Sequence, residues 1–207
     1  AYEEYRVFTD AVCLYPARDL LFYYADIKGK TITDRRMEVL RTLIEKEDKD
    51  PVTVITTMDA FLDGLPHPEE IRKERISLSG GDGVDLTEFE ERLSALGYER
   101  ESQIEGPGQF AVRGGILDVF PLTEENPVRI ELWGDEVDSI RSFAVESQRS
   151  IEKLESVTIY PASENWKNEM DTVSFLEYFP VEKSLLLLDE PQRLQEMAEE
   201  VESEYFH

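Results

Sequence analysis

Two short stretches near the middle of the chain place charged and aromatic residues in strand-like patterns. "VRGGILDVFP" (112–121) carries Arg113 and Asp118 in apolar runs joined by Gly-Gly, and "VRIELW", a little later, carries Arg129 and Trp133. Arginine donates charge-assisted hydrogen bonds, tryptophan buries a large area, and both residue types are enriched where proteins bind each other. These residues therefore favour recognition of a protein partner over catalysis.

Side-chain alternation places several of these residues on one face of a predicted sheet. In "VRIELW" the apolar side chains face one side, so Arg129, Glu131 and Trp133 face the other. Arg113 reaches the same face if its strand pairs nearby. A second interpretation stays open here: the tryptophan packs beneath a helix, and Arg129 pairs with Glu131 or another acid. Asp118 is predicted to be a structural hydrogen-bond acceptor for an arginine or a turn.

Two fragments look like halves of an ATP site. "GKT" at 29–31 lacks the glycine that a phosphate loop needs five residues earlier, since position 24 is Tyr24, so Lys30 is predicted to be a solvated turn residue. "LLLLDE" at 185–190 has the form of a buried strand ending in an acidic pair, the place of a magnesium-binding carboxylate in an ATPase. We interpret these two fragments as parts of an ATPase-like scaffold that lacks ATPase chemistry.

Other catalytic and metal-binding groupings are not supported by the sequence. His67 and His207 lack metal-ligand spacing, and neither suits a Ser/His/Asp arrangement. Cys13 lies in an apolar run and is predicted to be a buried bystander. The adjacent Asp135 and Glu136 are predicted to be solvated hairpin charges. We expect no enzymatic activity, no cofactor and no metal ion.

Charge and hydropathy limit the partners further. The chain has 207 residues with 46 acidic against 22 basic side chains, a formal charge of −24. Nonspecific binding of nucleic acid requires Lys and Arg to neutralise phosphates, so we expect repulsion from DNA and from anionic membranes. No apolar run is long enough to span a bilayer and no export signal begins the sequence, which predicts a soluble, cytoplasmic chain. The start without Met and the end after a helix suggest a piece of a longer protein.

The predicted elements fall into three blocks. Strand and helix signals alternate over residues 1–78, and a turn-rich break, "SLSGGDGVD", follows. Residues 79–155 contain a helix capped by Asp85 and then four period-two strands, "QFAVR", "GILDVFP", "VRIELW" and "EVDSIRSF". Residues 156–207 return to α/β signals. The predicted fold is a parallel-sheet α/β domain, a degenerate P-loop or helicase-like scaffold, interrupted by a small antiparallel α+β insertion.

One long stretch carries a family resemblance. "GPGQFAVRGGILDVFPLTEENPVRIELWGDEVDSIRSFAVESQRSIE" resembles the N-terminal region of the bacterial transcription-repair coupling factors (Mfd), whose N-terminal module is similar to the damage-recognition protein UvrB. The flanks "VCLYPARDLLFYY", "RRMEVLRTLI", "VTVITTMDAFLDGLP", "SVTIYPASE" and "LLLLDEPQRLQEMAEEV" resemble the two halves of the same module. The resemblance covers nearly the whole chain.

The resemblance implies a non-catalytic adaptor in nucleotide excision repair. In this family the inserted domain binds UvrA, and the contact residues match Arg113, Arg129 and Trp133, although the family also has phenylalanine at the last position. It also implies that a C-terminal domain of the longer protein covers this surface, and that RNA polymerase and DNA bind to other domains. The alternative is a fragment of a UvrB-type damage-recognition ATPase whose phosphate loop lies upstream of Ala1.

Overall fold

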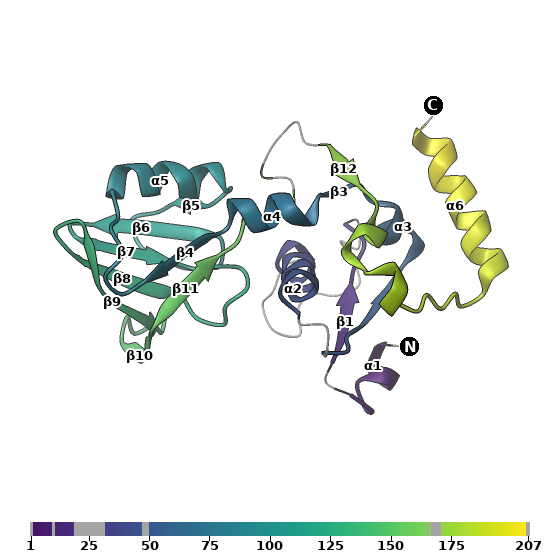
Figure 1. Cartoon of the computed structure of the whole chain (residues 1–207), viewed down its shortest axis with the longest axis horizontal. Helices are drawn as coiled ribbons and strands as arrows, with labels where there is room; N and C mark the ends of the chain where they lie inside the picture. Colours follow the sequence, from purple (N-terminus) through teal and green to yellow (C-terminus); the bar gives the residue numbers. More distant parts are fainter. Residues whose placement is uncertain are drawn as a thin grey trace. The chain divides into compact units, whose positions relative to one another are not determined.

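A computed structural model describes residues 2–9, 11–18, 32–46, 50–164, 166 and 171–205 (Figure 1). The chain forms two compact units, one from residues 1–68 with 171–207 and the other from residues 69–170. Lys30 and Tyr24, which the phosphate-loop argument used, lie outside the described residues, and so does His207.

The first unit combines helices with two short strand pairs. β1 pairs with β2 in parallel, and β3 pairs with β12 antiparallel. Their order along the chain is α1 (Tyr2–Tyr5), β1 (Val12–Tyr15), α2 (Ile32–Glu45), β2 (Thr53–Thr56), α3 (Met58–Leu62), β3 (Leu65–Pro66), β12 (Thr172–Val173), two 3-10 turns (Phe175–Tyr178 and Val181–Lys183) and α6 (Pro191–Tyr205).

A buried arginine connects several elements of this unit. Arg36 on α2 is almost completely buried, donates to the Pro16 carbonyl at 2.7 Å and pairs with Asp63 at 2.8 Å. Its guanidinium lies 4.2 Å from the centre of the Tyr15 ring, which stacks on Phe175 at 4.4 Å. Since a buried charge is costly unless it is paired, these contacts tie α2 to the end of β1 and to the residues after α3.

The first unit is mixed α/β, and the predicted parallel-sheet P-loop scaffold is not seen in its described residues. In the described part of the first unit, β1 and β2 form the single parallel pair. The strand predicted at 185–188 is absent: these residues have no regular structure, and Leu185 to Leu188 are exposed. A strand needs a neighbour for its backbone groups, and no described strand pairs with this segment. The prediction of a buried strand there was therefore wrong.

The second unit is built mainly on antiparallel pairing, and only the short β5 pairs with its neighbour β6 in parallel among the described strands of this unit. Six strands follow the order β10-β9-β8-β7-β6-β5, and a separate pair joins β4 to β11. Its elements are α4 (Pro68–Glu74), β4 (Ile76–Ser79), α5 (Leu86–Ala95), β5 (Glu99–Arg100), β6 (Gln109–Arg113), β7 (Ile116–Val119), β8 (Val128–Trp133), β9 (Glu136–Phe143), β10 (Ser150–Leu154) and β11 (Ser156–Ile159). The four predicted strands and the predicted helix are confirmed as β6 to β9 and α5.

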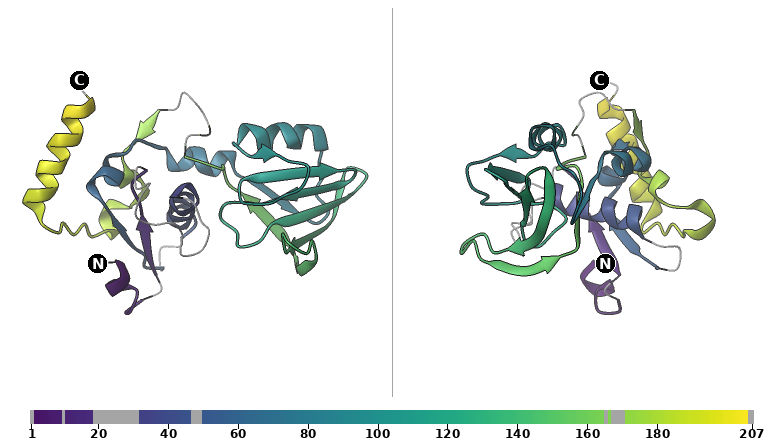
Figure 2. Two further views of the ribbon diagram at one scale, coloured as in Figure 1. Left: turned by 180° about the vertical axis from the view of Figure 1, so that it is seen from behind. Right: turned by 60° about the vertical axis from the view of Figure 1, so that its left-hand side comes forward.

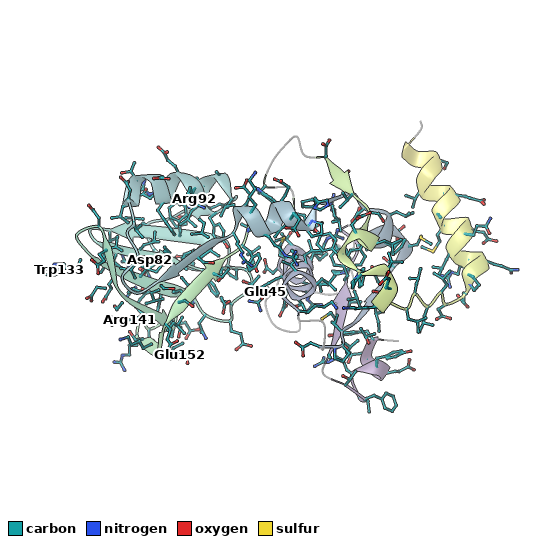
Figure 3. The ribbon with its side chains drawn as sticks, viewed as in Figure 1. Glu45, Asp82, Arg92, Trp133, Arg141 and Glu152 are labelled. Atoms are coloured by element: carbon teal, nitrogen blue, oxygen red, sulfur yellow. The ribbon has the colours of Figure 1, made fainter. Side chains whose placement is uncertain are left out.

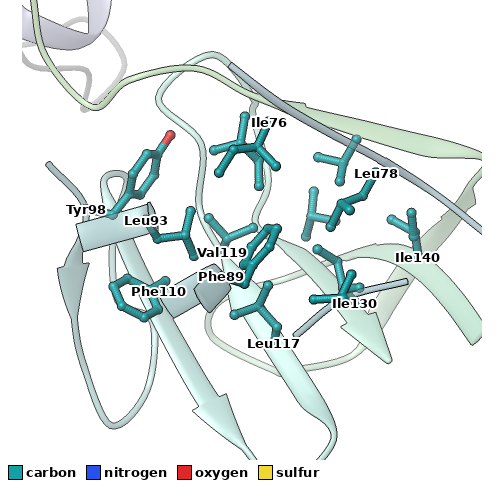
Figure 4. Close-up of a cluster of buried hydrophobic side chains, with 14 of the residues drawn as sticks. Ile76, Leu78, Phe89, Leu93, Tyr98, Phe110, Leu117, Val119, Ile130 and Ile140 are labelled. Atoms are coloured by element: carbon teal, nitrogen blue, oxygen red, sulfur yellow. The ribbon is translucent and has the colours of Figure 1, made fainter. Parts of the chain in front are cut away.

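One apolar cluster holds this unit together. The sheet curls around it, with α5 on one side and the β4–β11 pair on the other (Figure 2). Figure 4 shows how the buried side chains meet: Ile76 and Leu78 from β4, Phe89 and Leu93 from α5, and Phe110, Leu117, Val119, Ile130 and Ile140 from the sheet.

Local sequence explains the placement of α5. The Asp85 side chain accepts hydrogen bonds from the backbone N–H groups of Thr87 (2.9 Å) and Glu88 (3.1 Å), as the predicted N-cap requires. Gly97 follows the last turn with φ +88°, a conformation that favours glycine. The helix therefore starts and stops at residues specified by its own sequence.

The compact second unit extends past the predicted insertion of residues 79–155 at both ends. β4 and β11 pair with each other, and Ile76, Leu78, Val157 and Ile159 are buried in its core. "SLSGGDGVD" forms the turn after β4 inside this unit instead of a break between units. Local turn signals do not distinguish the two cases, because the pairing of β4 with β11 is long-range.

Candidate partner-binding surface

The face of the sheet opposite the apolar cluster carries a row of charged side chains. Cross-strand partners run from Asp118 on β7 to Arg129 on β8, then to Arg141 on β9 and Lys153 on β10. Directly paired residues point to the same face of a sheet, so these four lie side by side across four strands. Three of them are basic, in a chain whose formal charge is −24.

The predicted alternation in β8 is confirmed. Val128 and Ile130 are buried against the apolar cluster, whereas Arg129 and Glu131 are partly exposed and Trp133 is 85% exposed. The second interpretation, a tryptophan packed under a helix, is therefore wrong. Arg129 does pair with an acid, as that interpretation required, but the acid is Asp118.

Asp118 holds two arginines at once. Its side chain is only 2% exposed, and it accepts hydrogen bonds from Arg129 Nε (2.7 Å), Arg129 Nη2 (2.8 Å) and Arg113 Nη2 (3.0 Å). The predicted role of Asp118 as an acceptor for an arginine is confirmed. Two hydrogen bonds from one guanidinium to one carboxylate form a fork that allows few relative orientations. The pair with Asp118 therefore fixes the direction of the Arg129 side chain.

Two further contacts complete the setting of Arg129. Its Nη2 donates to the Gln148 side-chain oxygen at 3.0 Å, and its guanidinium lies 4.5 Å from the centre of the Phe143 ring. The hydrogen bond that Arg129 donates to Asp118 raises the pKa of Arg129 above its ordinary value; burial opposes this, and the charges of Asp118 and Glu131 add to it. Arg129 is therefore a fixed cation.

Gln148 is held in place by the turn between β9 and β10. Its φ is +56°, its backbone N–H donates to the Ala144 carbonyl at 2.8 Å, and its side-chain amide donates to the Val145 carbonyl at 2.8 Å. A non-glycine residue with positive φ is uncommon. The turn thus presents the Gln148 oxygen to Arg129 at some cost in backbone conformation.

A second charged group lies next along the strands. Glu131 accepts hydrogen bonds from Ser139 Oγ at 2.9 Å and from Arg141, which is about one-third exposed. Arg129 and Arg141 are direct cross-strand partners, an arrangement of like charges that is unfavourable by itself. Asp118 and Glu131 each take one of the two arginines, which relieves this repulsion.

Arg113 and Trp133 lie at the same end of the sheet. Each ends its strand just before a glycine turn, Gly114 with φ +62° and Gly134 with φ +65°. The end of β8 is joined to the Gly114–Gly115 turn by a hydrogen bond from the Leu132 N–H to the Gly115 carbonyl at 2.8 Å. In Figure 3, Trp133 projects from this end of the sheet, and Arg141 lies further along it.

The structure thus brings together the three residues singled out by sequence, although they differ in accessibility. Trp133 is 85% exposed and the Arg113 side chain 50%, but Arg129 is only 17% exposed. Sequence reasoning missed Arg141, Gln148 and Lys153. The alternation of "EVDSIRSF" could have placed Arg141 on the outer face, whereas Gln148 reaches the site only through a turn that has no sequence signature.

The described parts of both units contain no group of three His, Cys, Asp or Glu side chains able to hold a metal ion. Asp135 and Glu136 are exposed at the β8–β9 hairpin, as predicted. Cys13 is half-buried rather than fully buried; burial and, to a smaller degree, the charge of Glu38 raise the pKa of its thiol. No helix among these residues is long and apolar enough to cross a membrane.

Comparison with known proteins identifies the family of the domain that carries this surface. Residues 76–165 match a family model described as "UvrB interaction domain". The chain is similar to the "Transcription-repair-coupling factor" of Bacillus subtilis, with 39% identity over 74% of the chain and 13% of that relative. It is also similar to those of Staphylococcus haemolyticus (36% over 72%, and 12% of the relative) and Mycobacterium bovis (36% over 74%, and 13%).

The chain spans only about an eighth of the length of these relatives. The matched domain lies within the second unit and contains the charged row, Arg113 and Trp133. The chain therefore belongs to the transcription-repair-coupling factor family, and residues 76–165 are its UvrB interaction domain.

Proposed function

We propose that this chain is a non-catalytic adaptor module of transcription-coupled nucleotide excision repair, which recruits UvrA through the outer face of its UvrB interaction domain. The observation that carries the proposal is Trp133, a large aromatic side chain left 85% exposed at the end of the sheet that also carries Arg113, in a domain of this family. A large exposed aromatic with arginines around it has the composition of a binding hot spot.

The charges of this face support a protein partner with acidic groups. Arg113, Arg129, Arg141 and Lys153 share the face with three acids: Asp118 and Glu131, which pair with arginines, and Glu136, the cross-strand partner of Trp133. This local excess of positive charge stands out against the strongly negative chain. Such a patch orients an approaching partner and accelerates association at low salt.

The family assignment gives the wider setting of the proposal. In the longer protein, the surface would be covered by a C-terminal domain, and RNA polymerase and DNA would bind elsewhere. The first unit would be a degenerate relative of the ATPase scaffold, without a bound cofactor. The chain would act in the cytoplasm.

The test is calorimetric titration of UvrA with the wild-type chain and with Trp133→Ala and Arg113→Ala. We expect Trp133→Ala to weaken binding by about 2 kcal/mol or more, roughly 30-fold, and Arg113→Ala to weaken it less. Val181→Ala and Arg193→Ala, which remove an exposed apolar and an exposed basic side chain from the first unit, are the matched controls. Equal affinity of Trp133→Ala and Val181→Ala for UvrA would refute the proposal.

Arg129→Glu is a poorer test than its position suggests. Its new carboxylate would lie next to Asp118, whose oxygen is 2.7 Å from Arg129 Nε, and near Glu131. Loss of binding in that variant would mix damage to the fold with damage to the surface. An ATP titration of the wild-type chain separates the adaptor from a UvrB-type ATPase, which would bind the nucleotide.

A further inference from the structure

Gln148 brings a neutral hydrogen-bond acceptor to the charged row of the outer face. Its side-chain oxygen accepts from Arg129 Nη2 at 3.0 Å, and its side-chain nitrogen donates to the Val145 carbonyl at 2.8 Å. The second bond orients the amide, because only its nitrogen carries hydrogens to donate to a carbonyl oxygen. The turn itself therefore directs the Gln148 oxygen toward Arg129.

The β9–β10 turn has an unfavourable backbone conformation at this position. Gln148 has a φ of +56°, a value that strains a residue with a Cβ atom and suits glycine. A glycine would ease the turn, but it would remove the side-chain amide. Since strained backbone residues cluster at functional sites, the strain points to a use for this amide.

The contacts of Arg129 occupy its donors unequally. A guanidinium has one hydrogen on Nε and two on each terminal nitrogen. Asp118 accepts from Nε and Nη2, and Gln148 accepts from Nη2 as well, so both hydrogens of Nη2 are engaged. Nη1 makes no hydrogen bond to the described residues and is not among their buried unpaired atoms, so it faces solvent. In the described structure, Arg129 therefore offers a partner the two donors of Nη1.

The amide holds Arg129 without cancelling its charge. Arg113 and Arg129 share the carboxylate of Asp118, so these three side chains carry two positive charges and one negative charge, a net charge of +1. An acid at position 148 would also hold Arg129, but it would reduce this net charge to zero. Glutamine fixes the arginine and leaves the group attractive to a negatively charged acceptor.

We propose that Gln148 is a positioning residue for partner binding: it engages Nη2 of Arg129, so that Nη1 receives one acidic side chain of the partner. This inference rests on the proposed function, because it concerns the same UvrA-binding surface. A side chain that is already ordered loses less conformational freedom on binding, so more of its contact energy appears as affinity. Gln148 acts through Arg129 and need not touch the partner.

The first test compares the binding of UvrA to the wild-type chain and to Gln148→Gly. Glycine removes the amide but suits the φ of +56°, so the opposing effects should leave the urea midpoint of the second unit close to that of the wild type. We expect UvrA to bind about threefold more weakly, near the lower end for ordering one long side chain, because Asp118 still holds Arg129. A purely structural role of Gln148 would leave the affinity unchanged at unchanged stability.

The second test uses Gln148→Glu to change the charge. We expect its association with UvrA to lose part of the salt dependence seen in the wild type, because the net charge of the group falls from +1 to zero. Gln148→Gly keeps the charge and should keep the salt dependence. Gln192→Glu, at an exposed position of α6 in the first unit, makes the same change of charge elsewhere and is the matched control.

A measurement without UvrA shows whether Gln148 acts through Arg129. The Arg129 Nε–H signal in the ¹⁵N NMR spectrum should exchange faster with water in Gln148→Gly than in the wild type. Weaker binding without this change would overturn the inference, because the effect would not pass through Arg129.

The binding results also separate this inference from the proposed function. A wild-type chain that does not bind UvrA would refute both. UvrA affinity that falls in Trp133→Ala but stays unchanged in Gln148→Gly would overturn the positioning role alone. Tighter binding of Gln148→Gly would overturn it too, since Gln148 would then compete with the partner for Arg129.

Discussion

Removing the carboxylate of Asp118 should destabilise the second unit strongly. Its side chain is 2% exposed and accepts three hydrogen bonds from two arginines. Asp118→Ala would leave Arg129, itself only 17% exposed, without its counter-charge. Breaking a buried ion pair costs about 3–5 kcal/mol. Arg129 would keep Gln148 and the Phe143 ring, and Arg113 can turn to water, so we expect a loss of about 3 kcal/mol.

Three further variants test whether the loss of stability in Asp118→Ala comes from the unpaired charge of Arg129. Asp118→Asn keeps the shape but turns amide hydrogens toward the guanidinium, so it should cost about 2 kcal/mol. Asp138→Ala removes an exposed carboxylate from β9 and should change stability by less than about 0.5 kcal/mol. The double variant Asp118→Leu with Arg129→Met replaces the pair by apolar groups and should recover most of the loss, because no charge is then left buried and unpaired.

The measurement is urea unfolding followed by circular dichroism. Because the chain has two compact units, the transition of the second unit should be identified by hydrogen exchange of the β8 amides. A loss below about 1 kcal/mol in Asp118→Ala would refute the reasoning that Asp118 balances a buried charge. The reasoning would also be refuted if the double variant lost as much unfolding free energy as its two single variants lose together.

Two further predictions concern a helix cap and a thiol. Asp85→Ala should lower the free energy of unfolding by about 1 kcal/mol, because it removes the acceptor for two N–H groups of α5; Asp85→Asn, measured in the same urea titration, should restore most of it. Cys13 should react with iodoacetamide more slowly in the folded chain than after denaturation, because burial raises its pKa. Since folding favours the protonated thiol, its contribution to stability is complete below the pKa of the unfolded thiol and is lost as pH rises through the raised folded value. Equal alkylation rates in the folded and denatured chains would contradict this.

The sequence predicts those parts of the site that depend on local periodicity. The alternation of "VRIELW" places Arg129 and Trp133 on the outer face because the side-chain period of a strand is two wherever the strand pairs. It cannot say which residue lies opposite Arg129. That depends on the register between strands. Only the structure shows that Asp118, Arg141 and Lys153 lie in one row with Arg129.

Long-range pairing explains the larger differences in the fold. β4 and β11 are far apart in sequence, and each reads locally as a strand of an α/β domain; their pairing moves both into the second unit. Residues 185–188 show a second way in which prediction from sequence fails. Its composition predicts burial, yet burial requires a neighbouring element, and Leu185 to Leu188 are exposed in the described structure.

The geometry of the charged row also predicts how the binding energy divides between its arginines and Trp133. Ordering a flexible side chain at an interface costs about 0.5–1.5 kcal/mol, and Asp118 and Gln148 already hold Arg129 in the folded chain. The same contacts occupy Nε and Nη2 of Arg129, so a partner's acceptor would have to use Nη1 or compete with Asp118. Trp133 has no such competitor, and binding would remove its exposed ring from water. We therefore expect Trp133 to dominate the affinity and the arginines to set orientation and association rate, so that salt should slow association in the wild type and in Trp133→Ala alike.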